Sequence, residues 1–216
     1  MRGCTKQCNS RALLFVLLVA FKSSIAAMTE EKDASSEAPE FDADGWTADG
    51  LHRLHFAASE TNTDALKALL GSGVDVNLVG KECSSSALHS AAREGNEPAA
   101  KMLLERKASI DAQDGGQRTA LVWAAQNGHL ELVKYLLDAR ANIDGAADSG
   151  ITPLSSAAGW GKDAVVKELL TRKASLAVKD KKGLTVLDKA KQWKKPAILE
   201  LLNAAAAQQS SVAASS

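Results

Sequence analysis

Apolar residues along the chain follow a pattern that recurs five times between residues 49 and 204. In each copy a leucine precedes one or two alanines, and two adjacent leucines follow about ten residues later. Apolar residues spaced three and four apart predict two short helices in each copy. One such helix pair cannot bury its own apolar face, so the copies are expected to stack. The first leucine advances in steps of 34, 33, 33 and 33 residues, through Leu54, Leu88, Leu121, Leu154 and Leu187.

Polar and glycine residues mark where these helices begin and end. Hydroxyl side chains precede the first helix of the later copies and are suited to capping its N-terminus. Glycines follow that helix in three copies, where they would end it in a left-handed turn. Turns rich in Asp and Gly lead into the next copy. The capping residues are Ser86, Thr119, Thr152 and Thr185, and the glycines are Gly95, Gly128 and Gly161.

This register resembles the ankyrin repeat. Residues 152–158 (TPLSSAA) match the family motif T-P-L-H-x-A-A, and the glycine turn, paired leucines and segments such as 73–77 (GVDVN) follow in order. The resemblance implies an all-α fold, a solenoid of five helix-turn-helix repeats with β-turn fingers. It also implies a concave face, lined by fingers and first helices, that binds protein partners. The expected repeats are about 49–80, 81–113, 114–146, 147–179 and 180–204.

The repeats depart from the motif at two kinds of place. Its histidine remains as His55 and His89, and we expect the repeats with Val122, Ser155 and Asp188 there to lose the histidine's backbone hydrogen bonds. Second helices end at non-glycine residues, each costing about 1 kcal/mol in a left-handed conformation. A cation there can recover energy from the helix dipole, or a basic row can face an acidic partner. These residues are Lys107, Arg140 and Lys173, with Arg106 and Arg172 beside them.

The segments outside the repeats carry different signals. Residues 1–27 combine basic residues, an apolar run at 12–21 and small residues near Ala27, which is typical of a signal peptide. Ten apolar residues are too few for a helix that spans a bilayer, which needs about 20; a retained anchor or a buried helix is the alternative. Residues 28–48 are expected to be an acidic disordered linker whose Phe41 and Trp46 fold back on the first repeat. Residues 205–216 are expected to be a disordered tail.

Charge narrows the classes of partner. The whole chain has 26 basic and 26 acidic residues, and without the four basic residues of the leader its net charge is −4. A mildly acidic chain argues against nucleic acid as a partner. We therefore expect a protein partner of unknown identity and a monomer, in the secretory pathway or secreted, or alternatively in the cytoplasm. Membrane association is expected only if the leader is retained.

Histidine and cysteine residues are too few and too scattered to predict catalysis. His52, His55, His89 and His129 lie at places where structural hydrogen bonding explains them, and no spacing is typical of a metal site. Cys83 could act as a nucleophile with His89 as its base, but it is expected in a finger, with His89 aimed into the stack. We expect a protein that is not an enzyme and has no metal and no cofactor.

Tryptophans supply the candidate binding residues. Trp160 and Trp193 occupy one register place in successive repeats, where the other copies have Glu60, Glu94 and Asn127. Tryptophan is strongly enriched at binding hot spots, so the pair predicts a binding face; the alternative is that it covers the C-terminal end of the stack. The full predicted partner-binding set is Trp123, Trp160, Trp193, Asn127, Arg118, Asp148, Ile151, Lys181 and Lys182. The predicted function is a protein-protein interaction module; a membrane-tethered or cytosolic regulatory or adaptor subunit of an enzyme complex is the alternative.

Overall fold

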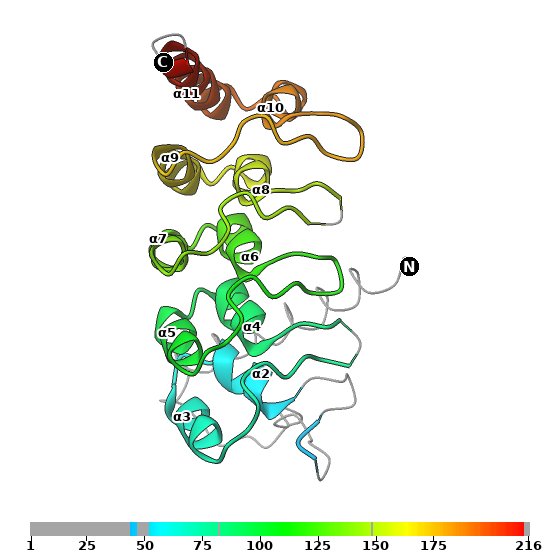
Figure 1. The fold of residues 1–216 in the computed structure, drawn as a ribbon, viewed down its shortest axis with the longest axis vertical. Helices are drawn as coiled ribbons and strands as arrows, with labels where there is room; N and C mark the ends of the chain where they lie inside the picture. The colour runs from blue at the N-terminus through cyan, green and yellow to red at the C-terminus, as the bar shows by residue number, and fades with distance from the viewer. Residues whose placement is uncertain (1–43, 47–51, 82, 148, 214–216) are drawn as a thin grey trace, which may run out of the picture.

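In a computed structural model, the helices of the described residues form five pairs that stack into an elongated array (Figure 1). The structure describes residues 44–46, 52–81, 83–147 and 149–213. One helix of each pair lies beside the projecting fingers and is called inner; the other, called outer, lies on the opposite side (Figure 1). The predicted all-α repeat solenoid is confirmed. The inner helices are α2 (Arg53–Ser59), α4 (Ala87–Glu94), α6 (Ala120–Asn127), α8 (Pro153–Trp160) and α10 (Val186–Trp193), and the outer helices are α3 (Asp64–Gly71), α5 (Glu97–Glu105), α7 (Leu130–Asp138), α9 (Asp163–Thr171) and α11 (Pro196–Ala213).

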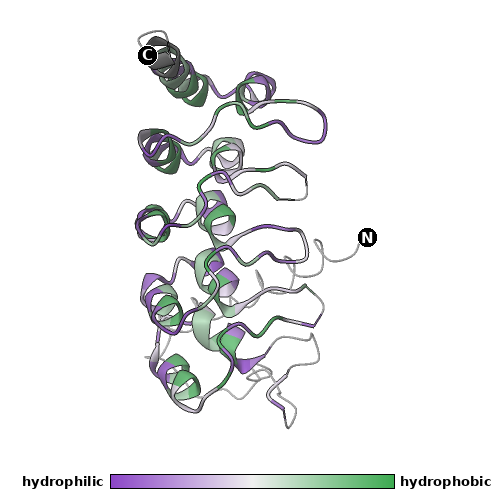
Figure 2. Cartoon of the chain, in the orientation of Figure 1, coloured by the Kyte–Doolittle hydropathy of each residue, from purple (hydrophilic) through white to green (hydrophobic). Residues whose placement is uncertain are grey.

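Alanine pairs and leucines form one continuous core through the stack. Ala91 and Ala92 of α4 are fully buried, and their small side chains let α4 pack closely against α2 and α6. Leucines of the outer helices close the core from the other side, and Leu103 and Leu136 are fully buried. Burying one such side chain stabilises the fold by about 1.5–3 kcal/mol. Hydrophilic residues colour the outer edges of the outer helices and much of the last finger (Figure 2).

The predicted hydroxyl caps are present at Thr119, Thr152 and Thr185. The Thr119 hydroxyl accepts a hydrogen bond from the Val122 N–H at 3.4 Å, and Gly128 ends α6 in the left-handed conformation with a φ of 87°. In the first repeat, where the motif threonine is replaced, Nδ1 of His52 accepts from the Leu54 N–H at 3.1 Å. An imidazole therefore takes over the capping task of the hydroxyl.

The two motif histidines join adjacent repeats. In His89, Nδ1 accepts from the Ser86 N–H at 3.1 Å, and Nε2 lies 2.9 Å from the carbonyl oxygen of Arg118 in the next finger. His55 bridges in the same way, with Nε2 2.7 Å from the Ser85 carbonyl oxygen. Burial lowers the pKa of both histidines below 6.5, although the backbone hydrogen bonds oppose this shift. Both rings are therefore neutral at pH 7.

Repeats without the histidine keep part of this arrangement. The Ser155 hydroxyl accepts from the Thr152 N–H at 3.0 Å, and the Asp188 carboxylate accepts from the Thr185 N–H at 3.0 Å. The expectation that these repeats lose the histidine's bonds was therefore wrong, for the bond to the capping residue, in the repeats with Ser155 and Asp188. It holds for the repeat with Val122, whose side chain has no polar atom. A short polar side chain can accept that local bond because the donor, the N–H of the capping residue, is only three residues away.

A second series of bonds links the loops that follow the outer helices. In each of three repeats, an Asn or Asp oxygen accepts a backbone N–H from the loop of the next repeat. The next place in this register is Ala177, whose side chain has no oxygen. The bonds join Asn77 Oδ1 to the Ser109 N–H at 2.8 Å, Asp111 Oδ1 to the Asn142 N–H at 2.9 Å and Asp144 Oδ1 to the Ser175 N–H at 2.8 Å.

Both predicted boundaries of the repeat domain require correction. The tail predicted to be disordered over 205–216 is helical as far as Ala213, because α11 continues beyond the paired leucines. Alanine is the best helix former, and 203–207 (NAAAA) supplies four of them. The predicted linker over 28–48 extends too far, since the Gly45 carbonyl already accepts from the Arg53 N–H at 2.9 Å.

Trp46 packs on the first repeat, as predicted. Its ring lies edge-on to His52 with centroids 5.3 Å apart, and the Lys81 ammonium lies 4.5 Å from the Trp46 ring centroid. Phe41 and the leader at 1–27 lie outside the described residues. Among the helices that are described, none has the length and apolar character needed to cross a membrane.

Candidate protein-binding surface

One large apolar side chain at the end of an inner helix is mostly exposed to solvent. Trp160 is the last residue of α8 and has 64% of its surface exposed. Within the described ranges, the other exposed large apolar residue is Val79, at 48%. Helix α8 ends at this point because Gly161 adopts a left-handed φ of 73°. The predicted exposure of Trp160 is confirmed.

Trp193 occupies the same register place one repeat later but is only partly exposed. Its indole packs against α8 at Gly159, where an added Cβ would lie 3.4 Å from Cζ2 and Cη2 of the ring. A Cβ at that distance would be in ordinary van der Waals contact with the ring, so the indole packs directly against this place of the helix, where another repeat has Arg93. The Lys195 ammonium donates to the Gly159 carbonyl at 2.6 Å. We use the name tryptophan surface for Trp160, Trp193, Gly159 and Lys195.

The tryptophan surface lies on two helices that pack together, α8 and α10. Trp193 faces back toward the fourth repeat, and Trp160 is open to solvent although it belongs to that repeat. This geometry disfavours the alternative in which the pair covers the C-terminal end of the stack. It leaves Trp160 exposed at the end of α8, and Trp193 packed against the same helix at the preceding residue, Gly159.

Trp123 is not part of an exposed surface, which corrects its prediction as a binding residue. It is 8% exposed and belongs to the core. Its indole N–H donates to Oδ2 of Asp114 at 3.0 Å, and the Arg118 guanidinium lies 3.9 Å from the ring centroid. Trp123 therefore stabilises the third finger, the turn at residues 114–118.

Arg118 completes this support. Its guanidinium pairs with Asp114 at 3.0 Å, and its backbone N–H donates to the same carboxylate at 2.9 Å. Burial opposes the ionisation of Asp114, but hydrogen bonds from the backbone of Arg118 and Gly116, the Arg118 charge and the Trp123 indole outweigh it and hold its pKa below 3.8. Arg118 was predicted to contact a partner, but its charge is used within the finger.

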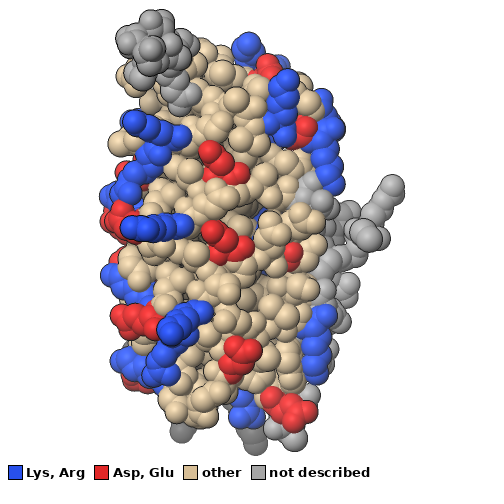
Figure 3. Space-filling view, viewed as in Figure 1, with Lys and Arg blue, Asp and Glu red and all other residues tan. Residues whose placement is uncertain are grey.

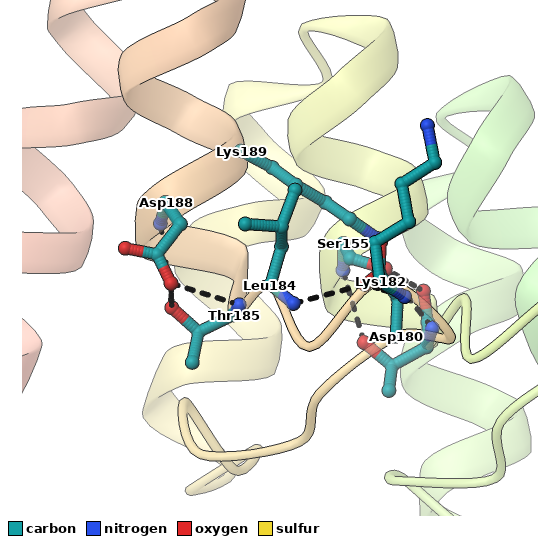
Figure 4. Close-up of polar contacts among 8 residues, drawn as sticks. Ser155, Asp180, Lys182, Leu184, Thr185, Asp188 and Lys189 are labelled. Carbon is teal, nitrogen blue, oxygen red and sulfur yellow. Dashed lines mark hydrogen bonds and ion pairs between the residues drawn. The ribbon is translucent and has the colours of Figure 1, made fainter.

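The last finger is built in the same way with different side chains (Figure 4). Oδ1 of Asp180 accepts from the backbone N–H groups of Lys182 and Leu184 at 2.8 and 2.9 Å, and Oδ2 pairs with the Lys189 ammonium at 3.0 Å. These bonds, the one from Leu184 foremost, lower the pKa of Asp180 below 3.8. Lys189 is in the register place of Trp123, so either an indole or an ammonium can support a finger.

The remaining predicted binding residues differ in their availability. Lys181 and Lys182 are exposed, and the Lys182 side chain extends away from Asp180 (Figure 4). Ile151 is half-buried in the fourth finger. The Asn127 amide donates to the Arg93 carbonyl at 2.8 Å, so it joins repeats. Asp148 lies outside the described residues.

The geometry around Cys83 gives no support to a catalytic pair. Both ring nitrogens of His89 are engaged, by Ser86 and by the Arg118 carbonyl, and the residue is 2% exposed. The Cys83 carbonyl accepts from the Gly115 N–H at 2.7 Å, which fixes one finger against the next. Across the described ranges, no cluster of three or more His, Cys, Asp or Glu side chains could hold a metal ion.

Two of the basic residues at the outer helix ends make contacts within the stack. Lys107, Arg140 and Lys173 have the predicted left-handed conformation, with φ of 64°, 68° and 63°. The Arg106 guanidinium donates to the Leu70 carbonyl at the end of α3, and Arg172 pairs with Asp138 at 2.7 Å. These contacts use Arg106 and Arg172 within the stack, whereas the side chains of Lys107, Arg140 and Lys173 are exposed. Figure 3 shows basic side chains along the edge of the outer helices and, separately, around the last finger.

Stacked helix pairs with projecting fingers and a solvent-facing set of inner-helix ends define a helical repeat protein of the solenoid class. Family models described as ankyrin repeats match residues 54–147, as three copies, and 149–181, as one further copy. The chain belongs to the ankyrin-repeat family. The fifth helix pair, α10 and α11, follows the matched residues.

Two curated proteins resemble part of the chain. Serine/threonine-protein kinase 12 of Arabidopsis thaliana is 37% identical over 84 residues, which is 39% of this chain and 18% of that protein. Ankyrin repeat and SOCS box protein 18 of Homo sapiens is 36% identical over 75 residues, 35% of this chain and 16% of that protein. The similarity therefore spans less than a fifth of either relative. Ankyrin repeats are in general protein-interaction modules.

Proposed function

We propose that this chain is a non-enzymatic interaction module that holds a protein partner at the tryptophan surface and the adjoining last finger. The observation that carries the proposal is the exposure of Trp160, at 64%, on an inner helix end. An indole of this size in water costs free energy that a partner can recover by burying it. Trp193, held beside it against Gly159, adds a second aromatic surface with little freedom to lose on binding.

Parts of the tryptophan surface and of the last finger are held in place by hydrogen bonds before any partner binds. Lys195 is tied to the Gly159 carbonyl at 2.6 Å, and the last finger is fixed by the bonds to Asp180. A pre-organised surface loses less entropy when it binds. The exposed ammonium of Lys182 then lies at the rim, where charges steer a partner and select for it.

The test is capture of partner proteins by the immobilised full chain, compared with the Trp160→Ala variant. We expect specific partners to be lost from the variant while its helical circular dichroism matches the parent. Val79→Ala is the matched control, because Val79 is the other exposed large apolar residue and lies in the second finger. Equal capture by all three proteins would rule out this surface.

A regulatory or adaptor subunit is the second candidate function. It is favoured by the comparisons, because similar stretches occur within longer chains, one named as a kinase and one as a SOCS box protein. In this alternative the partner at the tryptophan surface is an enzyme subunit. Copurification of a catalytic activity with the parent, and its loss with Trp160→Ala, distinguishes this role from simple binding.

The compartment is proposed from the leader alone. The basic start, the apolar run at 12–21 and the small residues near Ala27 support entry into the secretory pathway. Sequencing the mature N-terminus tests this. A start at Ala27 or Met28 supports secretion, whereas an intact Met1 supports the cytoplasmic or membrane-tethered alternatives.

A further inference from the structure

The inner-helix ends change their chemistry along the stack. In the first two repeats the register places that follow the alanine pair read Glu60-Thr-Asn62 and Glu94-Gly-Asn96, and in the third Asn127-Gly-His129. In the last two repeats they read Trp160-Gly-Lys162 and Trp193-Lys-Lys195. The same backbone positions thus present carboxylates and amides at one end of the molecule and indoles with ammonium groups at the other.

The charge of whole repeats changes in the same direction. Residues 49–113 contain seven basic and nine acidic residues, a net of −2. Residues 147–204 contain eleven basic and six acidic residues, a net of +5. Basic side chains around the last finger are visible at the upper right of Figure 3. The aromatic surface therefore lies in the positively charged end of an otherwise acidic chain.

Two of these cations adjoin a tryptophan, Lys194 in the chain and Lys195 through Gly159, and a third, Lys162, lies toward the third repeat. Lys194 is exposed, follows Trp193 directly and caps α10 with a left-handed φ of 54°. Lys195 binds the carbonyl of Gly159, the residue before Trp160. The aliphatic stem of Lys162 lies close to Gly128, where an added Cβ would be 2.8 Å from its Cδ. Apolar area and positive charge are thus combined on one patch.

From this we infer that the last two repeats bind a segment of a partner protein in which a bulky apolar side chain is flanked by Asp or Glu. The apolar side chain would cover Trp160, and the carboxylates would face the ammonium groups of Lys194 and the last finger. Opposite charges across an interface steer the partner and select against basic competitors. This inference rests on the proposed function, because it requires the same surface to bind protein.

The test uses a phage-displayed library of random 12-residue peptides selected on the full 216-residue chain. We expect the selected peptides to be enriched in Asp and Glu around one large apolar residue, and to lose binding to Trp160→Ala. Peptides that depend on Trp160 but are neutral or basic would overturn this inference and leave the proposed function intact. If no selected peptide depends on Trp160, the proposed function fails with it.

A matched pair of charge reversals tests where the carboxylates bind. Lys194→Glu should weaken a selected acidic peptide about fivefold, the upper range for a solvent-exposed ion pair. Lys107→Glu is the control, because Lys107 is also exposed and has a left-handed φ of 64°, but lies at the end of α5 in the second repeat. We expect it to leave the affinity unchanged. Equal weakening by both variants would indicate only a general charge effect and would overturn the assignment.

Discussion

The second and fourth repeats have almost the same interior and very different inner-helix ends. Both bury the register leucine, Leu88 or Leu154, together with an alanine pair. Both end the inner helix at a left-handed glycine. Yet one presents Glu94 at the helix end and the other presents Trp160, which is mostly exposed. In a repeat protein the fold restricts the interior places of every copy alike, so differences at the remaining places are where function can be encoded.

Substitutions in the shared interior should cause the largest loss of stability, and the loss should be the same in the second and fourth repeats. Leu88→Ala and Leu154→Ala each remove a buried side chain from the same environment and should each lower the free energy of unfolding by about 2–5 kcal/mol. Urea denaturation followed by circular dichroism measures both. If one variant lost several times more than the other, the two interiors would not be equivalent.

A smaller effect distinguishes the repeats that have the motif histidine. His89→Ala leaves the buried Ser86 N–H and Arg118 carbonyl without their partner, at a cost of about 1–3 kcal/mol for each group that stays unsatisfied. Ser155→Ala in the fourth repeat removes two bonds, both to the capping residue Thr152, and none to the next repeat, so it should cost less. Denaturation of the two variants side by side provides the measurement, and a greater loss for Ser155→Ala would contradict it.

Acid should weaken the N-terminal half first. The folded-state pKa of His55 and His89 is lowered below 6.5, so their contribution to stability is complete above pH 6.5 and declines as the pH falls below it. Each histidine can change the free energy of unfolding by up to about 1.4 kcal/mol per pH unit in that range. Hydrogen exchange at pH 7.5 and 5.5, scaled for intrinsic rates, should locate the loss of protection in α2 and α4. A His55→Gln, His89→Gln double variant should abolish that change.

Protonation of the carboxylates that support the fingers should lower stability at a more acidic pH, and also in the C-terminal half of the stack. The lowered pKa values of Asp114 and Asp180 mean that their stabilising effect is present above pH 3.8 and is lost as pH falls through the lower folded values. Two separate acid transitions are therefore expected, the histidine one first.

The smallest effect on stability should come from the residue with the greatest effect on binding. Trp160→Ala should change the free energy of unfolding by no more than about 0.5 kcal/mol, because the side chain is mostly exposed. Calorimetry of the parent and the variant measures this. A loss above about 2 kcal/mol would mean that Trp160 is a packing residue.

Sequence reasoning predicted what is set within one repeat. The helix pairs, the capping hydroxyls and the left-handed turns each depend on neighbours within a few residues, so the register reveals them. The interpretation of Trp123 failed because its register place is buried, as it is at Ser90 and Ser156, and because its indole N–H is bound by Asp114, nine residues earlier in a finger. Asp180 and Lys189 are also nine residues apart, at the same places of the last repeat. This opposite-charge pair was the signal that could have indicated a contact between Asp114 and Trp123.

Two other features required the structure for a different physical reason. The partial burial of Trp193 comes from its packing against Gly159, 34 residues away, which no local pattern indicates. The length of α11 was missed because an Ala-, Gln- and Ser-rich segment fits both a polar tail and a helix, and helix propensity alone did not decide between them.

The loop bonds that end at Ala177 have a mechanical consequence. Each of the first three junctions between repeats has a side-chain hydrogen bond that joins one loop to the next, from Asn77, Asp111 or Asp144. The junction between the fourth and fifth repeats lacks this bond, because Ala177 has no side-chain oxygen. Under tension applied at the two ends, we expect that junction to part first. The fifth repeat, which carries Trp193, would then separate while the first four repeats stay stacked.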